Sequence, residues 1–224
     1  GVVGSVVSEV DHRDEVVRDV FAAAGYQEVI TYTMSNPERL RGLLGGAGAD
    51  AIDEAGARAG ERFLPVELEP LKLMNPLRAE EDSLRTTALG HVLETLTANL
   101  RFADRDVALF ELAKTFIPAG AELPEERRVL TAVVGQQLSS PGWDQQREST
   151  FFDLKGLAEL LLRRFGIERP MTAPFRHPTF QAGRCATVSA GDTLLAAFGE
   201  VSPATRALSD IGETAWALLV DVDA

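Results

Sequence analysis

The 224-residue sequence predicts an α+β domain built on a mainly antiparallel sheet flanked by helices. The predicted strands are short and rich in β-branched and aromatic residues, which suit a pleated surface. Two of them are separated by Ala190-Gly191-Asp192, a hairpin turn signal. Helical patterns do not alternate with single strands along the chain, and this argues against a parallel sheet of βαβ units.

The first predicted helix covers residues 9–24, because apolar residues recur there on one face. Ser8 can cap the start of this helix, and Gly25 stands where a left-handed cap closes its end. A β-branched and aromatic strand is predicted at 26–33. The apolar face of the helix consists of Val16, Val17, Val20, Phe21 and Ala24.

A second, short helix is predicted to begin at Pro37, in the first helical position, and to end near Leu44. Residues 45–62 are then rich in glycine and alanine and carry scattered acids, with few large apolar anchors. We expect a flexible surface loop there. Its glycines lack the spacing of a phosphate-binding loop.

The centre of the chain predicts a strand, a helix and a second strand. The strand at 66–74 is stopped by Asn75-Pro76, because proline cannot donate a ladder hydrogen bond. A helix follows at 83–100, with Ser83 as its predicted cap. The strand at 107–117 is apolar except for an acid and a base, so we expect helices on both of its faces.

The last third predicts a clear amphipathic helix at 153–165 and a final apolar strand at 215–222. Ser202 is a predicted cap, with Pro203 in the first position of a short helix. The remaining predicted elements are a strand at 129–135, a polar loop at 139–149 containing Trp143, an irregular segment at 171–181, and strands at 185–189 and 193–198.

Composition excludes several classes of protein. The net charge is -12, and basic residues occur at most in pairs, so a broad nucleic-acid-binding face is not expected. The single cysteine, Cys185, cannot form an intramolecular disulfide and is expected to be buried. His177 lacks partners at metal-ligand spacing and is interpreted as structural.

The absence of a signal-peptide pattern and of a disulfide favours the cytoplasm. Because the sequence begins at Gly1, we expect a piece of a longer protein.

Several short motifs stand in an order that resembles a known family. They are Asn75-Pro76-Leu77, Leu84-Arg85-Thr86, Asn99, Leu109-Phe110-Glu111 and Phe116, with Gly25 to Thr31 upstream and Gly199-Glu200-Val201 and Pro203 downstream. This set resembles the catalytic-like domain of the β subunits of bacterial phenylalanine–tRNA ligases. Each motif alone is weak, but the ordered set is specific and covers nearly the whole chain.

The resemblance implies a single class II aminoacyl-tRNA synthetase-like domain over residues 1–224, ending before a further domain. In class II enzymes the first helix and strand build a subunit interface, which here implies interface roles for Phe21, Tyr26, Val29 and Tyr32. The implied partner is the catalytic α subunit in an α2β2 assembly, which also binds tRNA(Phe). That holoenzyme uses ATP and Mg²⁺, whereas this chain is expected to hold no cofactor, metal or catalytic residue.

Two departures from the family of active enzymes imply that the domain does not activate an amino acid. Active class II enzymes place one arginine after the strand equivalent to 109–116, but this chain has Ile117 and Pro118 there. They place a second arginine in a glycine-rich segment, but neither residue type occurs after Glu213. Such cations stabilise the negative charge that develops on the phosphoryl oxygens. Lys114 is expected to be solvated or paired, and Arg85 to bind backbone carbonyls or an acid.

Two other functions remain as alternatives to a scaffold and interface domain. An active small-molecule ligase would need anion-binding arginines from other positions. A free-standing regulatory or RNA-binding paralogue could keep the class II fold, although the acidic composition disfavours direct RNA binding.

Overall fold

The fold is centred on one mixed but mainly antiparallel sheet. The computed structural model describes residues 9–44, 52–65, 69–102, 107–120, 123–139 and 146–223. Within them, seven strands pair in the order β1-β4-β5-β11-β10-β9-β8, and only the β1–β4 pair is parallel. These strands are β1 (Gln27–Glu28), β4 (Ala108–Ile117), β5 (Glu125–Val134), β8 (Met171–Pro174), β9 (Phe180–Ala190), β10 (Thr193–Val201) and β11 (Trp216–Asp221).

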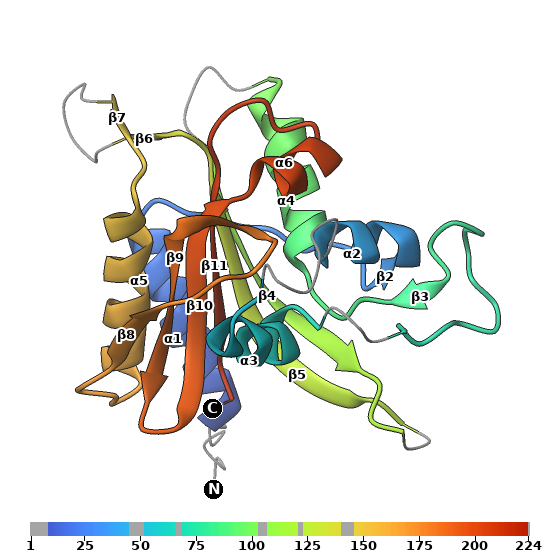
Figure 1. The fold of residues 1–224 in the computed structure, drawn as a ribbon, viewed down its shortest axis with the longest axis horizontal. Coiled ribbons are helices and arrows are strands. Elements are labelled where there is room, and N and C mark those ends of the chain that lie inside the picture. The colour runs from blue at the N-terminus through green and yellow to red at the C-terminus, as the bar shows by residue number, and fades with distance from the viewer. Residues whose placement is uncertain are drawn as a thin grey trace, which may run out of the picture.

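Helices cover both faces of this sheet (Figure 1). α1 and α5 pack against one face, and α3 and α4 pack against the other, with α2 and α6 beside α4. The prediction of an α+β domain with helices flanking an antiparallel sheet is therefore confirmed. The helices are α1 (Glu9–Ala23), α2 (Pro37–Leu44), α3 (Glu54–Phe63), α4 (Leu89–Leu100), α5 (Phe151–Arg164) and α6 (Pro203–Leu208).

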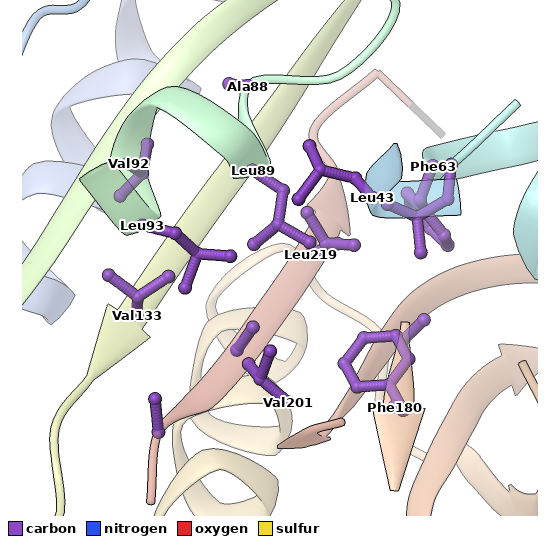
Figure 2. Close-up of a cluster of buried hydrophobic side chains, with 14 of the residues drawn as sticks. Leu43, Phe63, Ala88, Leu89, Val92, Leu93, Val133, Phe180, Val201 and Leu219 are labelled. Carbon is purple, nitrogen blue, oxygen red and sulfur yellow. The ribbon is translucent and has the colours of Figure 1, made fainter. Parts of the chain in front are cut away.

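Alternation along the strands builds two apolar cores. In β11, Leu218 and Val220 face the α1 and α5 side, while Ala217 and Leu219 face the α3 and α4 side. All four are fully buried. Figure 2 shows the second core, where Leu219 lies among side chains from α2, α4 and the strands. The prediction that the strand at 107–117 is covered on both faces is confirmed.

The predicted flexible loop at 45–62 is wrong for residues 54–62, which belong to α3. Residues 45–51 lie outside the described part of the chain. Asp53 caps α3 by accepting a hydrogen bond of 2.7 Å from the Gly56 amide, and Phe63 anchors the helix in the core. Small residues serve close packing here, since a Cβ on Gly56 would lie 1.8 Å from the Arg176 carbonyl oxygen.

Three predicted boundaries in the first half are also wrong. The central helix begins at Leu89, because Ser83 belongs to β3 (Ser83–Leu84), which pairs with β2 (Met34–Ser35). The predicted strand at 66–74 is reduced, among its described residues, to a bridge between Lys72 and Ser83. The predicted strand at 26–33 contains only the two residues of β1.

Most other elements agree with prediction. Gly25 ends α1 with φ of 87°, and Thr150 and Asp153 form a capping box at the start of α5. The β9–β10 hairpin, the Ser202 cap of α6 and the last strand are also confirmed. Two segments are more regular than predicted: residues 171–174 form β8, and β7 (Gln146–Glu148) pairs with β6 (Gln137–Ser139). Trp143 lies outside the described residues.

None of the described helices combines the length and the apolar composition that crossing a bilayer requires.

Replacing Gly56 with alanine tests the close approach of α3. We expect Gly56→Ala to lower the free energy of unfolding by about 1–3 kcal/mol, because the new methyl group overlaps the Arg176 carbonyl. Gly156 in α5 is the matched control, since a Cβ there meets nothing within 4 Å. Gly156→Ala should raise the same quantity by about 0.5–1 kcal/mol. Urea denaturation measures both, and equal effects of the two substitutions would contradict the packing of α3.

Candidate functional site

A buried ion pair joins Arg85 to Glu111 of β4. The Arg85 Nη2 lies 3.0 Å from the Glu111 Oε1, and both side chains are 4% exposed. Arg85 also donates from Nε to the Lys114 carbonyl at 3.0 Å and from Nη1 to the Thr31 hydroxyl at 2.8 Å and the Tyr32 carbonyl at 3.3 Å. The prediction that Arg85 binds backbone carbonyls or an acid is confirmed.

The same pair holds the chain that follows β1 against the sheet edge. Glu111 accepts hydrogen bonds from the Thr31 amide at 3.2 Å and from its hydroxyl at 2.6 Å. The Val29 amide donates to the Phe110 carbonyl, and the Arg85 amide donates to the Thr33 carbonyl. Residues 29–33 therefore lie along β4. They are held there largely by hydrogen bonds to side chains, and not by the longer strand that the sequence predicted.

This attachment presents two large apolar side chains to solvent. With Thr31 directed at Glu111, Ile30 and Tyr32 on either side of it are 92% and 65% exposed. We call residues 29–33 the docking edge. Met74 and Leu77, which follow the segment paired with β3, are also largely exposed. Exposed apolar side chains that are held rigidly are typical of a surface that another protein covers.

The predicted interface residues divide into two groups. Phe21 and Tyr26 are buried in the core of this chain, so the expectation that they lie exposed for a partner is wrong. The two rings contact each other edge to face at 5.4 Å, and Phe21 also packs on Phe110. Burial raises the pKa of the Tyr26 hydroxyl. Val29 is partly buried and Tyr32 is exposed, so a partner contact at these two residues stays a prediction.

Helices and apolar side chains cover the central strands on both faces of the sheet. On the α3 and α4 side, Ala113, Val133, Ala197 and Ala217 are buried beneath the helices. Figure 2 shows hydrocarbon side chains, among them Leu89, Leu93 and Leu219, filling this space. On the other side α1 and α5 cover a second apolar cluster. A nucleotide bound over these strands would require cationic and polar groups where the described residues are apolar.

The remaining family motif residues have structural surroundings. Gly199 permits the close approach of β9, because a Cβ on it would lie 2.4 Å from the Cys185 Cβ. Glu200 is buried and forms an ion pair with Arg184, and Pro203 begins α6. Asn75 is exposed and Pro76 is half-buried. Asn99 lies on the surface of α4 and donates a hydrogen bond to the Thr95 carbonyl. Phe110 is in the core.

The described charged residues are mostly paired with one another. Lys114 lies 2.8 Å from Glu126 on the neighbouring strand, as expected for a solvated and paired base. Arg128 forms ion pairs with Asp14 of α1 and with Asp223. The sequence did not indicate these long-range pairs, because their partners lie more than ninety residues away in the chain. Cys185 is buried as predicted, and its thiol donates to the Phe175 carbonyl.

His177 is a buried structural histidine at the start of the β9 region. It is 2% exposed, and its Nδ1 accepts a hydrogen bond of 3.3 Å from the Thr179 amide. Burial lowers the pKa of this imidazole to about 4. The side chain is therefore neutral in the fold at neutral pH.

The chain has the fold of a class II aminoacyl-tRNA synthetase. A solved pyrrolysyl-tRNA synthetase, PylSc from Desulfitobacterium hafniense, superposes with a TM-score of 0.69 at 16% identity, covering 96% of this chain and 66% of that one. A second structure of pyrrolysyl-tRNA synthetase from the same organism gives a TM-score of 0.66 at 15% identity, covering 96% and 67% of the two chains.

Within that class, the family model for the phenylalanyl tRNA synthetase beta chain CLM domain matches residues 2–222, and the chain belongs to this family. The beta subunit of phenylalanine–tRNA ligase from Syntrophotalea carbinolica is 30% identical over 214 residues, covering 92% of this chain and 24% of that protein. The beta subunit from Moorella thermoacetica is 31% identical over 217 residues, covering 94% and 24%. The chain thus spans about a quarter of the length of these relatives.

Breaking the buried ion pair should destabilise the domain strongly. Arg85→Met leaves the Glu111 carboxylate buried without its cation, and we expect the free energy of unfolding to fall by about 3–5 kcal/mol. The double variant Arg85→Met with Glu111→Leu removes both charges and should recover part of this loss. Denaturant titration of the wild type, the single variants Arg85→Met and Glu111→Leu and the double variant measures the coupling, and a double variant as unstable as the sum of the single changes would contradict it.

Acidification should weaken the fold through His177. The imidazole has a pKa near 6.5 when the chain is unfolded and about 4 when it is folded, so the unfolded state binds more protons in between. The stability is complete above pH 6.5 and falls as the pH drops toward 4, with a loss of about 2 kcal/mol between pH 7 and 5.

His177→Asn is the control for this titration, because asparagine keeps an acceptor for the Thr179 amide and does not ionise. Thermal or urea unfolding across pH 5–7 should show a shallower pH dependence for this variant. Parallel curves for the two proteins would show that another group is responsible.

Proposed function

We propose that this chain is a non-catalytic scaffold and interface domain of a phenylalanyl-tRNA synthetase beta subunit. In this proposal it docks on the catalytic alpha subunit of an α2β2 assembly in the cytoplasm. It thereby supports the ATP-dependent attachment of phenylalanine to tRNA(Phe) by that assembly. Family membership supports the beta-subunit context, and the finer role rests on the covered sheet and the docking edge.

The observation that carries the non-catalytic role is the apolar cover over the central strands on both faces of the sheet. α3 and α4 cover one face with buried residues such as Phe63 and Leu93, and α1 and α5 cover the other. Glu111, a buried charged side chain of the central strands, is already engaged by Arg85 and Thr31. Amino-acid activation needs preorganised cations at the α-phosphate, and these described surfaces supply hydrocarbon instead.

The observation that carries the docking role is the exposure of Ile30 and Tyr32 on a rigid segment. The backbone that carries these side chains is held through Thr31 and Glu111, so it loses little conformational freedom when a partner covers it. The chain as a whole carries a net charge of -12, so an apolar edge stands out from an acidic surface. Such an edge suits burial against an apolar partner surface better than direct contact with RNA phosphates.

Calorimetry tests the absence of an activation site. ATP and a non-hydrolysable phenylalanyl-adenylate analogue should release no saturable heat when titrated into this chain, because apolar side chains and helices cover the central strands. The catalytic alpha chain assembled with its partner serves as the positive control. Micromolar binding of either ligand to this chain would overturn the non-catalytic proposal.

Tyr32→Glu tests the docking edge in the full-length subunit. A charge at the centre of an interface should weaken association with the alpha subunit by about thirtyfold or more, corresponding to at least 2 kcal/mol. The melting temperature should change little, because Tyr32 is 65% exposed. Met171→Glu is the matched control, since Met171 is 72% exposed on β8 at the opposite edge of the sheet. Light scattering and sedimentation measure the association, and equal effects of the two variants would refute the docking edge.

A further inference from the structure

The outer face of α5 carries an exposed apolar stripe. The inner face of this helix is buried against the sheet and α1, whereas Phe152 and Leu160 are 73% and 38% exposed. Gly156 between them is also exposed, and residues four positions apart lie on one side of a helix, so the three residues form a line. α5 stands at an outer edge of the molecule, on the side away from β3 (Figure 1). The stripe is separate from the docking edge, because α5 packs on β9, β10 and β11 and not on β1.

Gly156 lies at the centre of this stripe and does not serve the packing of its own chain. Glycine inside a helix makes the helix less stable than alanine does. A Cβ at Gly156 would meet nothing within 4 Å, whereas Gly56 and Gly199 are required by close contacts within the fold. A glycine on an outer helix face allows the backbone of a second helix to approach closely, because the distance between packed helices depends on the side chains at the contact.

Two exposed charges flank the stripe at opposite ends of α5. Arg164 ends the helix, and Glu148 of β7 lies just before it. Neither side chain has an ion-pair partner among the described residues. The stripe therefore has a free cation at one end and a free carboxylate at the other, with apolar side chains between them.

Such a face is complementary to a second copy of itself. When two copies of α5 pack antiparallel and cross at Gly156, a residue four positions after the glycine faces the residue four positions before it in the other copy. Leu160 of one copy then packs on Phe152 of the other. Arg164 of one copy likewise approaches Glu148 of the other. A two-fold axis forms each of these pairs twice.

We propose that the outer face of α5 binds a second copy of this chain, antiparallel and with the two-fold axis at Gly156. The contact is weak in the isolated chain, because one helix face supplies less than the about 800 Å² per partner of a standard interface. We expect a dissociation constant of about 0.1–1 mM. The proposed α2β2 assembly holds two copies, and an effective concentration of about 1 mM within it would populate the contact. That consequence depends on the proposed function, but self-association of this chain does not.

Sedimentation equilibrium of the 224-residue chain from about 10 μM to about 2 mM tests the contact. The mean mass should rise from the 24.2 kDa of the monomer toward twice that value. Gly156→Ala should raise the dissociation constant about tenfold while it stabilises the monomer, because the new methyl groups separate the two backbones. Leu77→Glu, on an exposed side chain near β3, should dimerise as the wild type does. A constant mass over the whole range, or unchanged affinity in Gly156→Ala, would overturn the proposal.

A charge exchange tests the antiparallel arrangement. Arg164→Glu and Glu148→Arg should each weaken dimerisation about threefold to tenfold, because each places like charges together at both ends of the contact. The double variant exchanges the two charges and should dimerise as the wild type does. Because both residues are exposed, circular dichroism should show native-like folding of all three variants. A double variant that dimerises no better than the single variants would refute the arrangement.

Disulfide cross-linking tests the position of the two-fold axis. In Gly156→Cys the two introduced thiols lie beside the axis, where a disulfide can form, and the native Cys185 is buried. Oxidation with glutathione disulfide should give a covalent dimer at least tenfold faster than oxidation of Leu77→Cys, whose thiol is equally accessible but lies outside the contact. Equal rates for the two variants would show that the helices do not meet at Gly156.

Discussion

The buried pair of Arg85 and Glu111 is the constraint on which the sheet edge depends. Two charges removed from water are stable only when every donor and acceptor around them is used. Here that requirement draws in the Thr31 side chain and the carbonyls of Tyr32 and Lys114. The Arg85 guanidinium therefore joins segments that are far apart in the sequence. Its hydrogen bonds help to fix the position of residues 29–33.

Alternation along the strands explains how helices come to cover the central sheet on both sides. Once the edge is set, β4 places alternate side chains on two faces, and each face must be covered by helices. Ala113, Ala197 and Ala217 have small side chains, so α3 and α4 can pack close to the strands. A surface packed in this way buries much apolar area over the central strands.

The sequence predicted the elements whose signals are local. The strand at 107–117, the capping box of α5, the β9–β10 hairpin and the Ser202 cap all depend on residues close together in the chain. The sequence did not predict α3. This helix is rich in glycine and alanine because its backbone packs closely on neighbouring segments, and such small residues show little apolar periodicity. The family resemblance also implied an interface role for Phe21, but this residue packs in the core of its own chain. Likewise, the sequence did not identify Glu111 as the partner of Arg85, because the two residues lie twenty-six positions apart in the chain.

Rigidity decides how the docking edge can act. A flexible segment that carried Ile30 and Tyr32 would lose backbone and side-chain entropy on association, and that loss would cancel much of the free energy from apolar burial. In this chain the backbone of residues 29–33 becomes ordered during folding. The hydrogen bonds of Thr31 and the ion pair of Glu111 offset the entropy that is lost at that stage. Under the proposed docking, the stability of the domain and its affinity for the partner are coupled through the Arg85–Glu111 ion pair. Under that proposal, a change that loosens Arg85 should weaken association even though the Arg85 side chain is buried.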